Sequence, residues 1–205
     1  MNLTQQTYNK IAEDWHRDHS SDDWWVEGTG RLISMLPVRG TVLDVGCGSG
    51  VKSKYLTNNG LKVVGIDFSE NLIAIARREN LTSEFLIMDM RDVAELNREF
   101  DCVFAQASLL HIPRAEVVDV IKKLLKVLKI GGYFYAAVKG VKEDRQEEGI
   151  KIEDDYGYEY QRFFSYFRPE EIHQHFVEAG LEVVWENSMK TGNREWIQII
   201  GRKVS

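Results

Sequence analysis

The segment VLDVGCGSG, residues 42–50, decides the fold of this chain of 205 residues. A short apolar run leads directly into three glycines at alternate positions, Gly46, Gly48 and Gly50. Glycine allows the backbone to turn sharply and to approach a ligand closely, and a following helix offers free N–H groups at its N-terminus. The segment therefore predicts a buried strand, a glycine turn and a helix that together face a nucleotide-like ligand.

Short apolar runs alternate with helical patterns after this segment. After the first strand at 41–45, the runs predict strands at 62–66, 84–88, 101–107 and 133–138. The patterns predict helices at 51–60, 69–80, 91–96 and 114–129. This alternation implies right-handed crossovers and a mainly parallel sheet with helices on both faces. Residues 181–187 and 195–203 predict two closing strands in an antiparallel hairpin. The expected fold is α/β with seven strands.

Composition excludes several classes of protein. The hydrophobic fraction of 43% and the charged fraction of 28% are typical of a globular chain. The two cysteines, Cys47 and Cys102, are too few for a disulfide framework and do not form a zinc-ligand spacing. The apolar runs are far shorter than a membrane span, and the N-terminus does not resemble a signal peptide. We therefore expect a cytoplasmic protein without membrane contact.

The charge balance disfavours a nucleic-acid substrate. The formal net charge is -6, and residues 142–155 hold seven acidic and three basic residues. Proteins that follow a phosphate backbone usually carry the opposite balance. The acidic residues 142–155 predict a surface loop or flap.

Three carboxylates end three successive predicted strands: Asp44, Asp67 and Asp89. A carboxylate at position 44, two residues before the first glycine, repels a pyrophosphate but attracts an ammonium group. Asp67 is placed to bind the two ribose hydroxyls of an adenosine. Asp89 can accept a hydrogen bond from an adenine amino group while Met90 packs on the ring. The G-x-G-x-G spacing also departs from the G-x-G-x-x-G fingerprint of dinucleotide binding. These features favour a cofactor with a free amino acid moiety over NAD.

The sequence resembles the class I S-adenosylmethionine-dependent methyltransferases, in particular their type 11-like, small-molecule group. The resemblance runs from about Tyr8 to the C-terminus. It rests on VLDVGCGSG, GIDFSENLIAIAR, FLIMDMRD, and FDCVFAQASLLHIPR followed by LLKVLKIGGYFYAAVKG. It implies a Rossmann-like sheet, S-adenosylmethionine as cofactor, S-adenosylhomocysteine as product and a small-molecule methyl acceptor. The implied cofactor-binding residues are Tyr8, Asp44, Gly46, Cys47, Gly48, Gly50, Asp67, Phe68, Ser69, Asp89, Met90, Gln106 and Ala107.

The resemblance also implies an organisation for the whole chain. Residues 1–205 are expected to form a single domain. Within it, residues 1–38 form an N-terminal helical lid and residues 39–140 the cofactor-binding core. Residues 141–168 form an acidic and aromatic insert on the substrate side, and residues 169–205 the closing helix and strands. We predict no metal site, and either a monomer or a homodimer.

The sequence offers fewer candidates for methyl transfer and acceptor binding than for cofactor binding. His111 follows the fourth predicted strand and is either a general base at the mouth of the site or a histidine that orders its loop. Lys139 ends the fifth predicted strand and is either solvated or bound to an anionic group. Tyr8 and Trp15 either close a lid or pack a helix. The aromatic run 156–167 with Arg162 forms either a substrate pocket or core.

Three other functions stay open at this point. An RNA or protein methyltransferase has the same fold, but the acidic balance argues against it. A non-catalytic module that binds S-adenosylmethionine needs the same cofactor motifs. An NAD-dependent oxidoreductase is disfavoured by Asp44 and by the glycine spacing.

Overall fold

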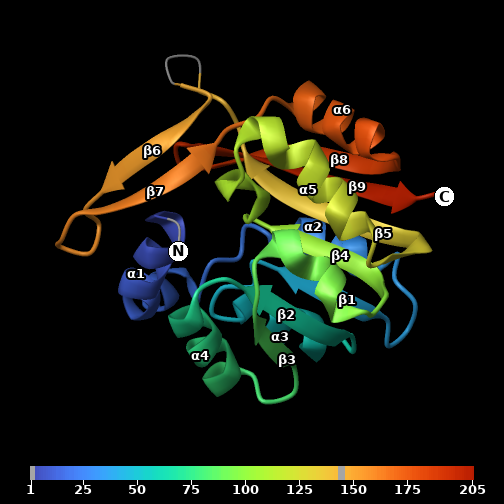
Figure 1. Ribbon diagram of the computed structural model, residues 1–205, viewed down its shortest axis with the longest axis horizontal. Coiled ribbons are helices and arrows are strands. Elements are labelled where there is room, and N and C mark those ends of the chain that lie inside the picture. The colour runs from blue at the N-terminus through green and yellow to red at the C-terminus, as the bar shows by residue number, and fades with distance from the viewer. Residues whose placement is uncertain (1–2, 143–145) are drawn as a thin grey trace.

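A seven-stranded sheet runs through the computed structural model, which describes residues 3–142 and 146–205 (Figure 1). The strand order is β3-β2-β1-β4-β5-β9-β8. The strands are β1 (Thr41–Val45), β2 (Lys62–Asp67), β3 (Glu84–Ile87), β4 (Phe100–Gln106), β5 (Leu128–Lys139), β8 (Leu181–Thr191) and β9 (Arg194–Lys203). The first five are parallel, and β9 is antiparallel to both β5 and β8. The predicted mainly parallel sheet with an antiparallel C-terminal hairpin is confirmed.

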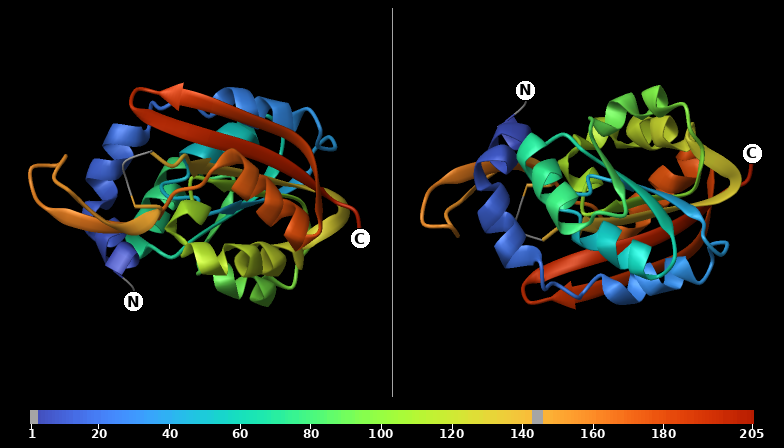
Figure 2. Two further views of the ribbon diagram at one scale, coloured as in Figure 1. Left: turned by 90° about the horizontal axis from the view of Figure 1, so that it is seen from above. Right: turned by 90° about the horizontal axis from the view of Figure 1, so that it is seen from below.

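Helices cover both faces of this sheet (Figure 2). One face packs against α2 (Val26–Ile33), α3 (Val51–Asn58) and α4 (Glu70–Glu79). The other packs against η1 (Met90–Leu96), α5 (Val117–Leu125) and α6 (Pro169–Ala179). Because each central strand is covered twice, β4 is buried at six of its seven positions. The carboxyl ends of the parallel strands are left as the accessible edge, where ligands of open α/β sheets bind.

The helix predicted at 114–129 is shorter in the structure. A 3₁₀ turn, η3 (Arg114–Glu116), precedes α5, which ends at Leu125. The chain then enters β5 at Leu128, which pairs with Phe100 of β4. Gly131 and Gly132, which follow the predicted helix in the sequence, lie inside this strand. The sheet pairing of residue 128 therefore overrides the helical pattern of residues 126–129.

The acidic residues 142–155 do not form only a loop. Residues 148–153 form β6 (Glu148–Glu153), which pairs antiparallel with β7 (Tyr160–Ser165) in a separate two-stranded sheet, and residues 143–145 lie outside the described part. β6 alternates, with Ile150 and Ile152 exposed and Glu153 buried against the partner strand. The buried Glu153 forms an ion pair with Arg162 of β7, which gives the acidic strand a charged partner.

The helix α1 (Leu3–His19) lies beside this hairpin and against α4 (Figure 1). The Thr7 hydroxyl donates to the carbonyl of Gln161 at 2.5 Å, and the N–H of Phe163 donates to the Thr4 hydroxyl at 3.2 Å. α1 is thereby fixed to β7 and closes the carboxyl edge of the sheet. Within residues 3–142 and 146–205, none of the helices has the length and apolar character needed to cross a bilayer.

Candidate active site

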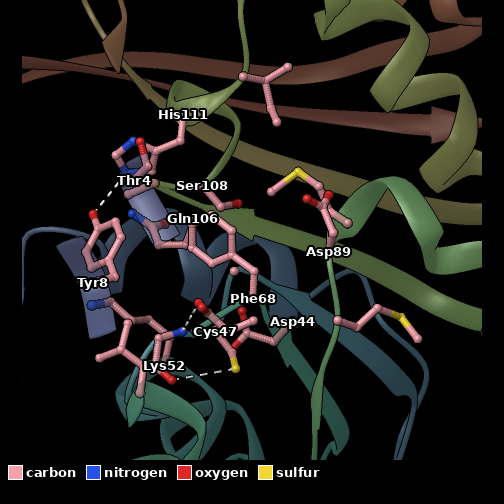
Figure 3. A pocket seen from close by; sticks show the side chains of 18 of the residues that line it. Thr4, Tyr8, Asp44, Cys47, Lys52, Phe68, Asp89, Gln106, Ser108 and His111 are labelled. Atoms are coloured by element: carbon pink, nitrogen blue, oxygen red, sulfur yellow. Dashed lines mark hydrogen bonds between the residues drawn. The ribbon is translucent and has the colours of Figure 1, made fainter. Parts of the chain in front are cut away.

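A cavity with about 900 Å³ of open space lies between α1 and the carboxyl ends of the parallel strands (Figure 3). Twelve of the residues predicted from the sequence line it: Tyr8, Asp44, Gly46, Cys47, Gly48, Asp67, Phe68, Asp89, Met90, Gln106, Ala107 and His111. Gly50 and Ser69 do not line it. Gly50 is the N-cap of α3, and the Ser69 hydroxyl caps α4 by accepting from the N–H of Leu72.

The glycine turn after β1 is fixed by backbone geometry. Gly46 and Gly48 have positive φ values of 69° and 56°. A Cβ atom at Gly46 would lie 2.4 Å from Cβ of Ser108, and one at Gly48 would lie 3.2 Å from the ring of Trp15. Glycine is therefore required both by the left-handed conformation and by the close approach of the Ser108 and Trp15 side chains. The turn presents backbone in place of side chains to the cavity.

Asp44 is a buried carboxylate on the cavity wall. It accepts a hydrogen bond from the Ser53 hydroxyl at 2.5 Å. Desolvation by burial raises its pKa to about 7, against smaller opposing effects of Ser53 and of the Lys52 ammonium. A cation bound in the cavity would relieve this cost by favouring the ionised form.

Asp67 and Asp89 are held by the backbone. Asp67 accepts from the N–H groups of Gly48 at 2.9 Å and Ser69 at 2.8 Å. Burial raises its pKa to about 6 although these bonds act in the opposite direction. Asp89 accepts from the N–H of Arg91 at 2.9 Å and forms an ion pair with its guanidinium at 3.2 Å. Both carboxylates are thus fixed in orientation and keep lone pairs for a ligand.

Two buried polar groups at the end of β4 have no hydrogen-bond partner among the described residues. The Gln106 side chain accepts from the Tyr135 hydroxyl at 2.8 Å, but its Nε2 is unpaired, as is the Ser108 hydroxyl. Between them Ala107 has a φ of 57°, an uncommon conformation for a residue with a side chain. Unpaired buried donors are costly in a folded chain, so this part of the cavity suits a polar ligand.

His111 makes two hydrogen bonds that fix its tautomer. Its Nδ1 lies 2.7 Å from the carbonyl oxygen of Phe163, which can only accept, so Nδ1 carries the hydrogen. Its Nε2 therefore accepts from the Tyr8 hydroxyl at 2.9 Å (Figure 3). Burial lowers the pKa of His111 to about 3. A base that titrates near neutrality, the first of the two sequence-based readings, does not fit this environment.

Arg162 continues this chain of hydrogen bonds. Its Nη1 donates to the Tyr8 hydroxyl at 3.0 Å, while its Nε and Nη2 contact Glu153 at 2.8 and 2.6 Å. Glu153 also receives Lys151 Nζ at 2.6 Å. The sequence reasoning missed Glu153 and Lys151, since both were assigned to a surface loop.

The chain is similar to known methyltransferases in sequence and in structure. Residues 42–132 match the family described as the methyltransferase domain. The chain is 31% identical over 134 residues to a ubiquinone biosynthesis O-methyltransferase of Hydrogenovibrio crunogenus, with 56% of this chain and 55% of the relative covered. A malonyl-[acyl-carrier protein] O-methyltransferase of Enterobacter lignolyticus is 30% identical over 103 residues, with 49% and 40% covered. The chain spans about half the length of the curated relatives it matches.

The fold extends this likeness over the whole chain. The crystal structure of a 1,6-didemethyltoxoflavin-N1-methyltransferase from Burkholderia thailandensis superposes with a TM-score of 0.77 at 16% identity, covering 99% of this chain and 88% of that one. The family match over residues 42–132, the sequence relatives and the shared fold together support a class I S-adenosylmethionine-dependent methyltransferase. The matched segment 42–132 contains nearly all of β1, all of β2 to β4 and every strand-end carboxylate described above.

Other residues that line the cavity were not selected for the site from the sequence: Thr4, Lys52, Leu72, Met88, Arg91 and Ile112. Trp15, which the sequence placed in a lid or in helix packing, also lines it, as does Ser108. Lys52 could have been predicted as a site residue, because it lies in the first turn of the helix that follows the glycine motif. No sequence pattern predicts Thr4 as a site residue, since it reaches the site only through the docking of α1.

A second cavity, with about 1,080 Å³ of open space, adjoins the first and shares Tyr8, Trp15, Lys52, Ala107 and His111 with it. It extends to the turn between β8 and β9. Lys139, which the sequence left as either solvated or bound to an anionic group, lines this cavity and is half-buried. Its Nζ lies 3.9 Å from the ring centroid of Phe164, and burial lowers its pKa to about 7. Lys139 is therefore not fully solvated, because Phe164 of β7 and Trp196 of β9 lie beside its ammonium group.

The described residues hold no cluster of three or more histidine, cysteine, aspartate or glutamate side chains placed to bind a metal ion.

Proposed function

We propose that the protein binds S-adenosylmethionine in the first cavity and transfers its methyl group to a small-molecule acceptor in the second. The observation that carries this proposal is the row of carboxylates Asp44, Asp67 and Asp89 at the ends of the adjacent strands β1, β2 and β3 around one cavity. Such a row suits a ligand that has an ammonium group, two ribose hydroxyls and an adenine amino group in sequence.

The residues present fit this cofactor. Asp44 would receive the ammonium group, and Lys52 at the cavity rim offers a positive charge for the carboxylate of the same amino acid moiety. Asp67 would accept from the ribose hydroxyls, and Asp89 from the adenine amino group, with Phe68 and Met90 against the rings. The unpaired donors of Gln106 and Ser108 supply further polar contacts.

The bound cofactor supplies an activated methyl group, because its sulfonium leaves as a neutral thioether that keeps the bonding electron pair. The protein then has to align the acceptor and exclude water. α1 closes the strand ends and provides Tyr8, while β4 provides Ala107 where the two cavities meet. We propose that neutral His111 positions Tyr8 and the β7 backbone in this junction.

The acceptor is a small molecule in this proposal. The second cavity opens to solvent at the β8–β9 turn and is otherwise lined mainly by α1, β5 and β7. The net charge of -6 disfavours RNA as a partner. By their names, the relatives described above are O-methyltransferases of ubiquinone biosynthesis and of malonyl-[acyl-carrier protein], and those acceptors are not assigned to this chain.

The first experiment measures the melting temperature with S-adenosylhomocysteine, S-adenosylmethionine, NAD and no ligand. A ligand at 100 times its dissociation constant stabilises by about 2.7 kcal/mol, which raises the melting temperature of such a domain by roughly 5–10 °C. We expect this shift with both sulfur compounds and none with NAD. A shift with NAD alone would contradict the proposal.

A pair of matched variants locates the effect. Asp67→Asn keeps the size of the side chain but removes its charge, and should weaken S-adenosylhomocysteine binding by about tenfold or more. Asp119→Asn changes an exposed carboxylate on α5 and should leave binding unchanged. Turnover with any acceptor then separates an enzyme from a non-catalytic binding module.

A further inference from the structure

The second cavity has flat aromatic walls. The rings of Trp24 and Trp196 stack with centroids 4.0 Å apart and planes at 20°, and Phe164 lies beside Trp196 in the same apolar cluster. All three line the cavity, together with Trp15 on the side of the first cavity. Walls of this kind favour a planar ring, because an aromatic ligand can stack on or meet the edges of such side chains.

The charges that line the cavity are mainly positive. Lys52, Lys139, Arg162 and Arg194 face Asp22 as the one lining carboxylate among the described residues. The whole chain has the opposite balance, with a net charge of -6. A positive cavity inside an acidic protein attracts an anionic ligand and repels a cationic one.

Three of these cations already have a partner or lie in water. Arg162 uses its three nitrogens on Glu153 and Tyr8. Lys52 lies in the field of two carboxylates, Asp22 and Asp44. Arg194 is exposed at the β8–β9 turn. Lys139 therefore differs from the others.

Lys139 has no carboxylate at ion-pair distance in the part of the chain that the structure describes. Its Nζ lies over the Phe164 ring at 3.9 Å and 5.8 Å from the Trp196 centroid. The charged groups around it are Arg162, Arg194 and Lys151, which repel it, and Glu153, which is bonded to two of them. An ammonium group has three donors, and one aromatic face does not satisfy them.

The burial of Lys139 also disfavours the charged form of its ammonium group. Desolvation and the neighbouring arginines lower the pKa of Lys139 to about 7. An anion bound in the cavity would favour the charged form and recover part of this cost.

We propose that the methyl acceptor is a planar aromatic molecule with an anionic oxygen group, and that this group binds to the ammonium of Lys139 between Phe164 and Trp196. The proposal rests on the proposed function, of which it names the acceptor class. The ring lies along the tryptophan wall, and the atom that receives the methyl group faces the junction of the cavities at Ala107. The anion is a carboxylate or a phenolate, which share this recognition chemistry.

The test is a calorimetric titration of the protein saturated with S-adenosylhomocysteine. The probes are 2-naphthoate, its neutral analogue 2-naphthamide, the phenolate 4-nitrophenolate and the non-aromatic cyclohexanecarboxylate. We expect at least one aromatic anion to bind about tenfold or more tightly than 2-naphthamide and than cyclohexanecarboxylate. Which of the two aromatic anions binds better identifies the oxygen group. Equal binding of 2-naphthamide and both anions would overturn the proposal.

Variants of Lys139 test the contact itself. Lys139→Met should remove the preference for the anion and leave 2-naphthamide binding unchanged, whereas Lys139→Arg should retain most of it. Lys190→Met, an exposed lysine of β8 outside the cavity, is the control and should bind as the parent does. An anion preference that persists in Lys139→Met would also overturn the proposal.

The same titrations separate this proposal from the proposed function. If S-adenosylhomocysteine does not bind, the proposed function fails, and the aromatic anions are titrated without it. If it binds and the aromatic anions show no preference, the acceptor class fails while the cofactor assignment stands.

Discussion

The two cavities are built in different ways. Around the first, neighbouring strands fix the site through backbone atoms, as where Ile66 accepts from the N–H groups of Gly46 and Cys47 at 2.8 and 3.0 Å. Around the second, side chains far apart in sequence hold one another: the Tyr8 hydroxyl donates to His111 and accepts from Arg162. The first site is thus part of the sheet, and the second depends on how α1 and β7 dock.

This contrast teaches which changes affect folding and which affect only the fit of a ligand. A change in the glycine turn disturbs β1, β2 and the cofactor cavity together. A change in the Tyr8–His111 contact leaves the sheet intact and alters the cover of the site. The predictions below test this difference, from the largest expected effect to the smallest.

Gly46→Ala should have the largest effect. Its Cβ would lie 2.4 Å from Cβ of Ser108, and its φ of 69° disfavours a side chain. The left-handed conformation costs about 1–2 kcal/mol and the overpacking about 1–3 kcal/mol. We expect urea unfolding to show a loss of roughly 2–5 kcal/mol, with loss of S-adenosylhomocysteine binding.

Gly60→Ala is the matched control for this change. Gly60 also has a positive φ, 86°, but a Cβ there meets nothing within 4 Å. It should lose only the conformational part, about 1–2 kcal/mol, and bind the ligand normally. Equal losses in the two variants would show that the close approach to Ser108 does not matter.

Cofactor binding should depend on pH through the first cavity. Burial raises the pKa of Asp44 to about 7 and of Asp67 to about 6, above the value of about 3.9 in an unfolded chain. Between about pH 4 and 7 the folded protein therefore binds more protons than the unfolded one. The stability from these two groups is complete below pH 4 and is lost as the pH rises through 7.

A bound ammonium group lowers the pKa of Asp44 again, because it favours the ionised carboxylate. We expect the affinity for S-adenosylhomocysteine to rise roughly tenfold to a hundredfold from about pH 5 to 8, with proton release near pH 6. Calorimetry in two buffers of different ionisation enthalpy measures the released protons. Asp44→Asn should lower this release, and Lys139→Met, in the second cavity, should not. A flat affinity profile for the parent protein would contradict the prediction.

The same contrast explains what the sequence could predict. A few consecutive residues determine each of the strands β1 to β4, the glycine turn and the three carboxylates. These features could therefore be predicted from the sequence. Glu153 and Lys139 were not, because their roles arise from packing between distant segments. An acidic stretch is typical of a surface loop. Only the structure shows that Arg162 of β7 forms an ion pair with Glu153 and lets this stretch form a strand.

Errors at element ends have the same origin. Residues 126–129 continue the helical pattern of α5, yet Leu128 pairs with Phe100 in the sheet. A pattern along one segment does not report which strand lies beside it. His111 was placed correctly at the end of β4, but its neutral state follows from Phe163 and Tyr8, which approach it from other elements.

Tyr8→Phe should have the smallest effect of the three. It removes one hydroxyl and keeps the ring that contacts Trp15 and Phe68. His111 Nε2 then loses its donor and Arg162 Nη1 loses an acceptor, which should destabilise by about 1–2 kcal/mol in urea unfolding. S-adenosylhomocysteine should still bind, because the strand-end carboxylates are unchanged.

The matched control is Tyr158→Phe, which removes the hydroxyl bonded to Asp14 at 2.7 Å on the surface of α1 and should cost less than half as much. The Tyr8 hydroxyl also favours neutral His111 by donating to it, so its removal should let the histidine pKa rise from about 3 while burial keeps it below the ordinary value. NMR titration of the imidazole checks this direction. If Tyr8→Phe destabilised the protein as much as Gly46→Ala, the cover of the site would be as integral to the fold as the glycine turn, and the contrast between the two cavities would not hold.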